Sequence, residues 1–509
     1  MFAKLVPNYV IASIAVAIGG FLNGYDTGSI GAIMEMDEFK KAVGHLSPFL
    51  VGFTVSLIML TAAIPSIFAG QLADSLGRIK VISLGALLFG IGAAIEGSSN
   101  GLPQFLVGRA IAGLGEGVYL SNVSVYICEI APYKHRGILA GLPQFMATAG
   151  VCIGYFTCYG TIAIQSTLAW RVPYIIQCLL TILFIASCII LPDSPRWLMT
   201  HGRRQEALTA LSKLDFSMVE AERDFLTVTE QRSSLSPWQS FLLLFRRGYR
   251  SRTILALFIL GMVQLSGIDG VLYYAPVLFS QAGLSSSTAS FLASGVSAIL
   301  MLAISIPAFL LADKWGRRTS AITGGIGLSG LMLLIGTLYA AGVVHSYGVA
   351  RWVVIVCVFA FGLTYCATWG IVGKIYASEI QPSNTRAAAN CVAQGLGFFT
   401  NWLVAILTPI LLDKSAFGAY FLFGGLALGT VAVLAAYMPE TRGRTLEEIQ
   451  HAFHQPGLKS LTRIVRRRAR RDPGHSSQAI EMDTPLPTTV AEASGRGSLT
   501  GLRLNIGAV

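Results

Sequence analysis

The sequence predicts an all-α membrane protein in which twelve transmembrane helices form two pseudo-symmetric bundles of six. Three observations support this prediction. Of the 509 residues, 53% are hydrophobic and only 12% are charged, whereas soluble domains are about 25% charged. Twelve apolar runs are each close to the length that crosses a bilayer, about 20 residues. Charged motifs that follow the second and fourth runs recur after the eighth and tenth runs, which indicates an internal duplication.

The apolar runs fall into two groups of six. The first six lie near residues 8–30, 48–69, 80–97, 102–127, 138–162 and 172–191. The second six lie near residues 252–280, 287–311, 319–342, 352–377, 388–412 and 417–438. The first run continues into a charged stretch without a cleavage pattern, so we expect it to be a span and not a signal peptide.

The polar segments between and after the two groups set the domain organisation. We expect an N-terminal six-helix bundle at 1–192, a cytoplasmic linker with short helices at 193–251, a C-terminal six-helix bundle at 252–440 and a largely disordered cytoplasmic tail at 441–509. The linker, the tail and the loops rich in Lys and Arg fall on one side, which the positive-inside rule identifies as the cytoplasm. We therefore expect a multi-pass protein of the plasma membrane with both termini in the cytoplasm.

Composition argues against several other classes of protein. The net charge of +11 is spread between the spans and over the tail instead of along one amphipathic face, so we expect no nucleic-acid partner. The eight cysteines lie in or beside apolar runs without metal-site spacing, so we expect no disulfide framework, no metal and no cofactor. We do not expect an enzyme. The basic stretch 460–473 would suit anionic lipid headgroups, although a solvated charge run or a trafficking signal is equally plausible.

Two charged motifs occur once in each half at the same relative position. LADSLGR at 72–78 recurs as LADKWGR at 311–317, and EIAPYKHR at 129–136 recurs as EIQPSNTR at 379–386. Such duplication implies two related bundles with a binding site at their interface. Ion pairs between these charges at the cytoplasmic helix ends would clamp the two halves and favour an outward-open state. The simpler alternative is charge that only fixes topology. The expected gate residues are Asp74, Arg78, Glu129, Arg136, Asp313, Arg317, Glu379 and Arg386.

Asp26 lies inside the first apolar run, where a carboxylate costs roughly 2.5 to 3.5 kcal/mol to insert. Its candidate partner is Arg109, in a glycine-rich run that permits close helix packing. Burial disfavours a charged carboxylate and a nearby guanidinium favours it, so a movement that changes their distance changes the proton affinity of Asp26. The two residues are therefore candidates for proton coupling, and a static pair is the alternative. For Glu116, in the same run as Arg109, we expect only a polar contact within the bundle.

Eight motifs stand in a fixed order between about residues 15 and 450. They are GYDTG, GRAIAGLGEG, VYICEIAP, PDSPRWL, QLSGIDGVLYYAP, DKWGRR, TWG and PETRGRTLEE. Together they resemble the motifs of the sugar porter family of the major facilitator superfamily, in particular fungal hexose transporters. The resemblance implies the major facilitator fold and alternating-access transport. Proton-coupled members carry an aspartate at the position of Asp26, so the resemblance also implies symport with protons.

The resemblance further implies which residues bind the substrate. Sites for sugars need amides, carboxylates and aromatic faces that pair with hydroxyl groups. The residues at positions that line the family's cavity are Gln144, Gln264, Tyr273, Tyr274, Asn401 and Trp402. The second half departs from the family's pattern, which counts against an ordinary hexose as substrate. The departures are Val263, Asp269, Met301, Cys366, Ile371 and Lys374.

Two of these departures, Asp269 and Lys374, are charged. Helical side chains tilt toward the N-terminus of their helix, which aims Lys374 at the cavity, although a lysine that snorkels to the membrane surface is the alternative. An unpaired ammonium at this depth needs an anionic partner. We expect that the two charges either attract each other across the cavity or together orient a substrate that carries a carboxylate or is a zwitterion.

Three functions remain open. The first is proton-coupled uptake of a sugar, either a monosaccharide or a close relative. A symporter for a polyol, an organic acid or a specialised metabolite would explain the departures better. The third, a nutrient sensor that does not transport, is disfavoured because the tail shows no recognisable repeats. The expected partners are a small-molecule substrate, the proton and the lipid bilayer, and we expect a monomer.

Overall fold

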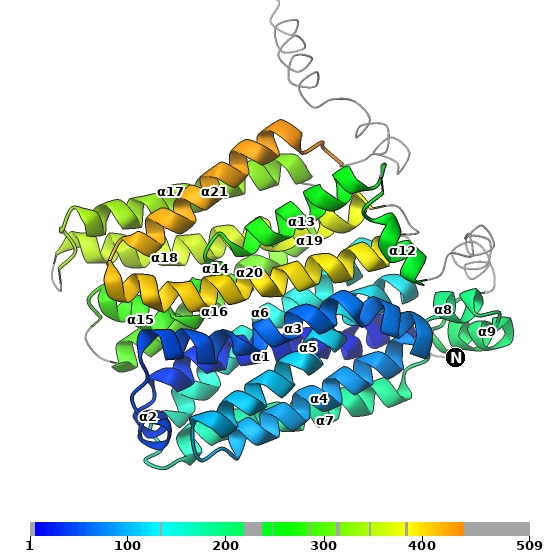
Figure 1. The fold of residues 1–509 in the computed structure, drawn as a ribbon, viewed down its shortest axis with the longest axis horizontal. Coiled ribbons are helices and arrows are strands. Elements are labelled where there is room, and N and C mark those ends of the chain that lie inside the picture. Colours follow the sequence, from blue (N-terminus) through cyan, green and yellow to red (C-terminus); the bar gives the residue numbers. More distant parts are fainter. Residues whose placement is uncertain are drawn as a thin grey trace, which may run out of the picture. The chain divides into compact units, whose positions relative to one another are not determined.

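The computed structural model shows a bundle of helices (Figure 1). It describes residues 6–132, 135–217, 237–246, 248–284, 287–311, 316–345, 348–381 and 385–441. Within these ranges every regular element is a helix. The predicted tail interactions at 460–473 lie outside the described residues.

Six long helices and one short helix make up the first half. They are α1 (Asn8–Glu35), α2 (Asp37–Val43), α3 (Pro48–Leu76), α4 (Arg78–Gly97), α5 (Leu102–Ile130), α6 (Arg136–Thr161) and α7 (Leu168–Ile190). Each long helix overlaps one of the first six predicted runs. In the part of the linker that the structure describes, three short helices follow before the second half: α8 (Pro195–Thr200), α9 (Arg204–Lys213) and α12 (Pro237–Leu243).

The second half repeats the arrangement with two broken spans. Its helices are α13 (Arg250–Gln264), α14 (Ile268–Tyr273), α15 (Ala275–Gln281), α16 (Ser287–Leu311), α17 (Arg317–Ala340), α18 (Val349–Ala367), α19 (Trp369–Glu379), α20 (Arg386–Lys414) and α21 (Gly418–Tyr437). The run predicted at 252–280 is divided into α13, α14 and α15, and the run at 352–377 into α18 and α19. The first break lies at Gly267, whose φ of +90° is readily adopted only by glycine.

Ten helical stretches among the described residues are long and apolar enough to cross a membrane. Two further helices overlap predicted runs. α5 carries Arg109, Glu116 and Glu129, and the described apolar part of α16, Leu292–Ala308, is shorter than the others. All twelve predicted runs are thus helical.

Glycines on α1 let it approach α6 closely. Gly20, Gly24 and Gly28 are four residues apart and therefore share one face of α1. A Cβ atom on Gly24 would lie only 1.9 Å from the carbonyl oxygen of Ala147. Small residues are the usual means of close helix contact in membranes, so this stripe fixes the distance between α1 and α6.

Glycines also line two faces of α5. A Cβ on Gly117 would lie 2.2 Å from the carbonyl oxygen of Ala62 on α3, and a Cβ on Gly115 would lie 2.4 Å from that of Gly85 on α4. Because α5 is close to both neighbours, Arg109 lies where α1, α3, α4 and α5 meet.

Each half has an equivalent internal hydrogen bond at the same end of the bundle. This end carries α8 and α9 and is here called the linker end. The hydroxyl of Tyr126 on α5 donates to the carbonyl of Pro192 at 2.7 Å. The hydroxyl of Tyr376 on α19 donates to the carbonyl of Pro439 at 3.3 Å. Tyr126 and Tyr376 each stand three residues before the glutamate of their repeated motif, so the sequence duplication is also a structural one.

A carboxylate that follows each of these prolines caps a helix of the same half. Asp193 accepts the backbone N–H of Ile79 in the first turn of α4 at 3.3 Å. Glu440 accepts the backbone N–H groups of Arg317 and Arg318 in the first turn of α17, at 2.7 and 3.1 Å. Free N–H groups and the helix dipole make a helix N-terminus a favourable place for negative charge. The first two residues of each motif, Pro192 and Asp193 of PDSPRWL and Pro439 and Glu440 of PETRGRTLEE, therefore bind helices of their own half.

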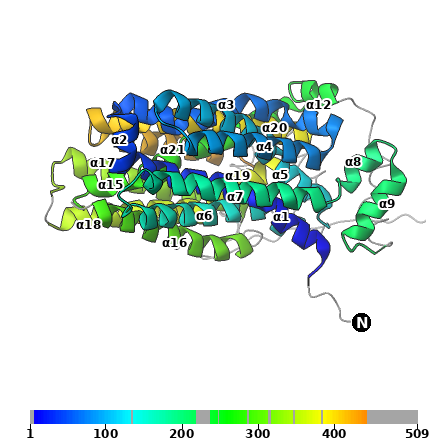
Figure 2. The ribbon, with the colours of Figure 1, turned by 90° about the horizontal axis from the view of Figure 1, so that it is seen from below.

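The two halves meet along helices from each side. α3 packs along α20 and α6 along α16, and both views show α3 and α20 side by side (Figures 1 and 2). The halves also touch at the opposite end, which carries α2 and is here called the α2 end. There a Cβ on Gly31 would lie 1.7 Å from the carbonyl oxygen of Tyr273, and the Tyr155 hydroxyl donates to the carbonyl of Leu272. Backbone contact between α1 and α14 thus closes the α2 end.

Candidate functional site

A cavity of about 140 Å³ lies between the two halves. Its wall is formed by α1, α3, α5 and α6 of the first half and by α13, α14, α16, α18, α19 and α20 of the second. The polar side chains in its lining are Asn23, Thr27, Gln144, Thr148, Gln264, Asp269, Tyr365, Lys374, Gln394 and Asn401. Amides and hydroxyls from both halves therefore face one space.

Five of the residues predicted to bind substrate line this cavity. They are Gln144, Gln264, Asp269, Lys374 and Asn401. The other three lie outside its lining. Tyr274 is buried and donates to the carbonyl of Ala405 at 2.8 Å, Tyr273 is fully buried, and Trp402 packs against Phe399 with ring centroids 5.4 Å apart.

The helix break explains why the two tyrosines miss the cavity. α13 ends at Gln264 and α14 begins at Ile268, with Gly267 in a left-handed conformation between them. The break changes the direction of the side chains that follow it. The carbonyl of Tyr273 lies against Gly31 of α1, and Tyr274 packs on α20.

Hydrogen bonds connect the charged and amide groups of the cavity. Lys374 Nζ donates to Gln144 Oε1 in the other half at 2.5 Å. Gln264 Nε2 donates to Asp269 Oδ2 at 2.8 Å, and its Oε1 accepts from the Tyr365 hydroxyl at 3.3 Å. No ion pair within 4 Å joins Lys374 to Asp269 among the described residues. Each charge is bound by a glutamine, and the two charges attract each other across the cavity without a direct contact. This attraction is one of the two expected arrangements.

Five polar lining residues escaped sequence analysis: Asn23, Thr27, Thr148, Tyr365 and Gln394. Two of them had a usable signal. Asn23 stands three residues before Asp26 and Gln394 seven before Asn401, spacings that place each pair on the same face of a helix. Tyr365 had no such signal, because its helix ends shortly after it at the break between α18 and α19.

Asp26 and Arg109 form a buried ion pair beside this cavity. Arg109 Nη1 lies 2.7 Å from Asp26 Oδ1 and 2.9 Å from Oδ2, and the two residues are 0% and 1% exposed. Arg109 Nη2 donates to the carbonyl of Val55 on α3 at 2.8 Å. Gln177 on α7 donates to Asp26 Oδ1 at 3.4 Å. Four helices therefore converge on one guanidinium–carboxylate pair.

Glu96 on α4 adds a second carboxylate to this pair, which sequence analysis missed. Its Oε2 lies 3.6 Å from Arg109 Nη1, and neither oxygen accepts a hydrogen bond from a described residue. Glu96 precedes the polar stretch Ser98–Asn100 and so looks like the end of a span. Two carboxylates facing one guanidinium leave an excess of negative charge when both are ionised.

Glu116 links the same region to the cavity wall. Its Oε1 accepts a hydrogen bond from the side-chain amide of Asn23, and Asn23 lines the cavity. Glu116 itself is fully buried. The polar contact expected for this residue is therefore made to a residue of the cavity wall.

The repeated charges of the first half cluster at the linker end. Arg78 Nη2 lies 2.5 Å from Asp74 Oδ1 and 3.1 Å from Glu129 Oε1. These ion pairs join α3, α4 and α5 within the first half. Arg317 begins α17 and is buried. Asp313 and the side chains of Arg136, Glu379 and Arg386 lie outside the described residues, so the expected clamp between halves stays a prediction.

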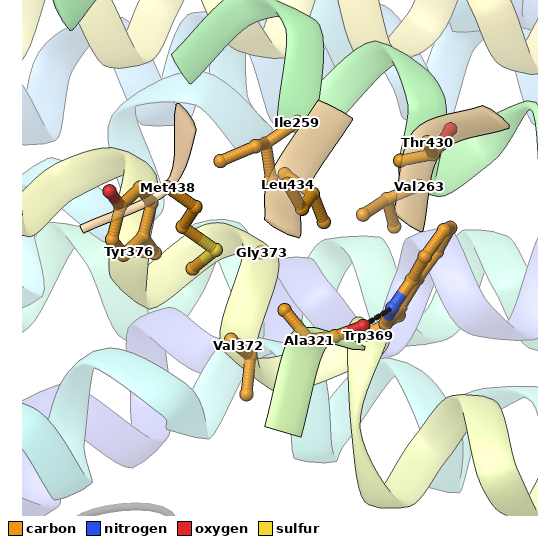
Figure 3. Close-up of a pocket in the computed structure, with 10 residues that line it drawn as sticks. All are labelled: Ile259, Val263, Ala321, Trp369, Val372, Gly373, Tyr376, Thr430, Leu434 and Met438. Atoms are coloured by element: carbon orange, nitrogen blue, oxygen red, sulfur yellow. Dashed lines mark hydrogen bonds between the residues drawn. The ribbon is translucent and has the colours of Figure 1, made fainter. Parts of the chain in front are cut away.

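A smaller pocket of about 10 Å³ lies within the second half (Figure 3). Its wall is almost wholly apolar, and the Trp369 indole that borders it donates to the carbonyl of Ala321 at 2.7 Å. A space of this size holds at most about one water molecule. It is a packing gap and not a binding site.

Comparison with known proteins matches residues 12–453 to the family described as "Sugar (and other) transporter". The arabinose-proton symporter of Bacillus subtilis is 29% identical over 451 residues, which cover 87% of this chain and 94% of that protein. The high glucose sensor RGT2 of Saccharomyces cerevisiae is 30% identical over 503 residues, which cover 93% of this chain and 65% of the sensor.

Among solved structures, the proton:xylose symporter XylE of E. coli superposes with a TM-score of 0.72. The match covers 87% of this chain and 99% of XylE, at 24% sequence identity. XylE belongs to the major facilitator superfamily. This likeness confirms the predicted fold of two six-helix bundles.

Proposed function

The chain belongs to the sugar transporter family, and from that premise we propose that it carries a sugar together with a proton across a membrane by alternating access. One observation carries the proposal: the buried pair of Asp26 and Arg109 lies beside a polar cavity between the two halves. A similar protein, the arabinose symporter of B. subtilis, couples its sugar to protons. The family to which it belongs is one of transporters and not of enzymes.

The proposed proton switch uses the contacts of Arg109. Its bond to the Val55 carbonyl anchors the guanidinium to α3, while Asp26 is the link to α1. A proton on Asp26 removes the charge that holds α1, while the carboxyl group of Glu96 stays 3.6 Å from the guanidinium. Protonation therefore favours a different arrangement of α1, which is what a population shift between two states requires.

In the proposed orientation the linker end faces the cytoplasm and the α2 end faces outward. The described basic residues Arg78 and Lys80, at the start of α4, lie at the linker end, in agreement with the positive-inside rule. The contact of Gly31 with Tyr273 then closes the outer side in this structure. Each proton carried inward would contribute about 2.3 kcal/mol per 100 mV of membrane potential. We propose the plasma membrane as the location and a monomer as the working unit.

Asp74, Arg78 and Glu129 are the residues of the proposed cytoplasmic gate whose ion pairs the structure describes. They hold α3, α4 and α5 together at the linker end. In an outward-open state the equivalent charges of both halves would come together there, and their separation would open the inner side. The five remaining predicted gate residues complete this proposal: Arg136, Asp313, Arg317, Glu379 and Arg386.

Uptake by the full chain in a host that lacks its own sugar transporters tests the proposal. Radiolabelled monosaccharides are supplied at an external pH below that of the cytoplasm, with and without a protonophore. We expect at least one sugar to accumulate above its external concentration and the protonophore to abolish the accumulation. Equal uptake with and without the protonophore would show facilitated diffusion and overturn the coupling.

A nutrient sensor is the second candidate, because the chain resembles the sensor RGT2 over 93% of its length. The cavity suits either function, since both bind a sugar. The uptake experiment separates them: a sensor binds sugar without moving it.

A further inference from the structure

We infer that the preferred substrate of this transporter is a sugar acid, a polyhydroxylated molecule with one carboxylate such as a uronate. This inference rests on the proposed transport function and names the substrate of the same cavity. Three features support the inference. The ammonium of Lys374 lies in the cavity wall, it is bound by the neutral amide of Gln144, and other polar side chains of the lining surround it.

Lys374 presents its charge to the cavity and not to the membrane surface. Its Nζ donates to Gln144 Oε1 on α6, across the interface between the halves, at 2.5 Å. Gln144 is itself a lining residue. A lysine that snorkelled toward the linker end would not reach this amide. The side chain therefore crosses the cavity wall from α19 to α6.

The ammonium of Lys374 has N–H donors that are not used in a hydrogen bond to a described residue, and no carboxylate is in contact with it. A lysine carries three N–H donors, and the described residues supply one acceptor, Gln144, and no carboxylate within 4 Å. Asp269 is the acidic residue of the described lining, and it is engaged by the amide of Gln264. When the cavity closes around a neutral sugar, the ammonium loses water and has only the carboxylate of Asp269, which lies beyond contact distance, as an anion, which is unfavourable. A carboxylate on the substrate removes this cost.

The rest of the lining suits hydroxyl groups. Asn401 Oδ1 is buried and accepts no hydrogen bond from a described residue, so it can accept one from a substrate hydroxyl. Asp269 Oδ2 is already bonded, which leaves its other oxygen as a second acceptor. The amides of Gln144, Gln394 and Asn23 add further polar partners. One cation surrounded by several hydroxyl partners matches a sugar acid better than an amino acid, which has few hydroxyls, or a dicarboxylate, which needs a second cation.

D-Glucuronate and D-glucose form a matched pair of probes, because they differ only in the group at carbon 6. We expect the wild-type protein to take up glucuronate, with a half-saturating concentration about tenfold or more below that for glucose. Glucosamine, which carries an ammonium instead, should compete poorly. Proton-dependent uptake of glucose without uptake of, or competition by, any uronate or aldonate overturns the inference and leaves the proposed function standing. Failure to take up any neutral or acidic sugar overturns both.

Substitution of Lys374 tests the assigned residue. Lys374→Gln should lose about tenfold or more in affinity for glucuronate and keep or improve its affinity for glucose, while Lys374→Arg should retain the preference. Lys414→Gln, at the exposed end of α20, is the matched control and should behave like the wild type. An unchanged preference in Lys374→Gln contradicts the inference. If that variant fails to reach the membrane, thermal shifts of the purified wild-type protein decide: stabilisation by glucose but not by glucuronate contradicts it equally.

Discussion

Arg109 on α5 holds both carboxylate oxygens of Asp26 on α1 with one guanidinium nitrogen, at 2.7 and 2.9 Å. The other terminal nitrogen is bound to the carbonyl of Val55 on α3. The arginine is thus fixed to α3 independently of Asp26. Loss of the charge on Asp26 would release α1 and leave Arg109 in place, so the pair can act as a connection that a proton breaks.

Replacement of Asp26 should separate transport from its driving force. We expect Asp26→Asn to abolish uphill uptake while exchange of internal for external substrate persists, because the amide cannot release a proton. Counterflow and concentrative uptake in proteoliposomes measure the two activities. Asp413→Asn, at the exposed end of α20, is the control. Breaking a buried pair costs roughly 3–5 kcal/mol, so thermal unfolding is recorded as well. Undiminished accumulation by Asp26→Asn would rule out the proton switch.

A bulky residue at Gly31 should hold the α2 end open. A Cβ atom there already lies 1.7 Å from the Tyr273 carbonyl oxygen, so Gly31→Trp must push α1 away from α14. We expect uptake to be lost while externally added substrate still binds, measured on intact cells with radiolabel at low temperature. Gly160→Trp is the control, because a Cβ at Gly160 meets no atom within 4 Å. Normal uptake by Gly31→Trp would show that this contact is not a seal.

The cap made by Glu440 should stabilise the second half. Glu440→Gln replaces an ionised acceptor of two backbone N–H groups, and loss of a helix cap costs about 0.5–2 kcal/mol. We expect a lower midpoint of thermal unfolding in detergent. Glu206→Gln removes a carboxylate from the exposed pair with Arg203 and should change the midpoint less, because exposed ion pairs contribute little to stability. Equal effects of the two substitutions would contradict the assigned cap.

Cys366 should report on occupancy of the cavity. Its thiol borders the cavity, and no other cysteine lines it in the described part of the chain. A membrane-permeant thiol reagent should therefore block uptake, a saturating substrate should slow the block, and Cys366→Ser should resist it. A Cys391→Ser variant is the comparison and should remain sensitive. Inhibition of Cys366→Ser at the wild-type rate would place the reactive thiol elsewhere.

The parts of this structure that were predictable from sequence are those set by strong local constraints. Apolar runs of bilayer length had to be helices, and an arginine inside such a run had to find an acidic partner, which identified Arg109 and Asp26 together. Glu96 escaped because a glutamate beside polar residues resembles the end of a span. Only the packing of α4 against α5, permitted by Gly115 and Gly85, places it next to the arginine.

The cavity lining was harder to predict where a helix is broken. Asp269 and Gln264 lie close to the break at Gly267, and both were identified. Beyond the break, Tyr273 lies against α1 and Tyr274 packs on α20. The left-handed glycine changes the direction of α14 and so turns both residues away from the cavity. A sequence gives the position of such a break but not the rotation across it. Lys374 was placed correctly toward the cavity because α19 is a regular helix from Trp369 onward.

The caps made by Asp193 and Glu440 also bear on how the protein is synthesised. Asp193 completes the first bundle, and the linker that follows docks on the same bundle, since Asp215 Oδ2 accepts the backbone N–H of Asn8 at 2.9 Å. Both partners of these two contacts have therefore been synthesised once translation reaches residue 217. Domains generally fold in the order of their synthesis. The first bundle can thus fold in the membrane while the second is still being translated, and two polypeptides divided between 217 and 237 should assemble when expressed together.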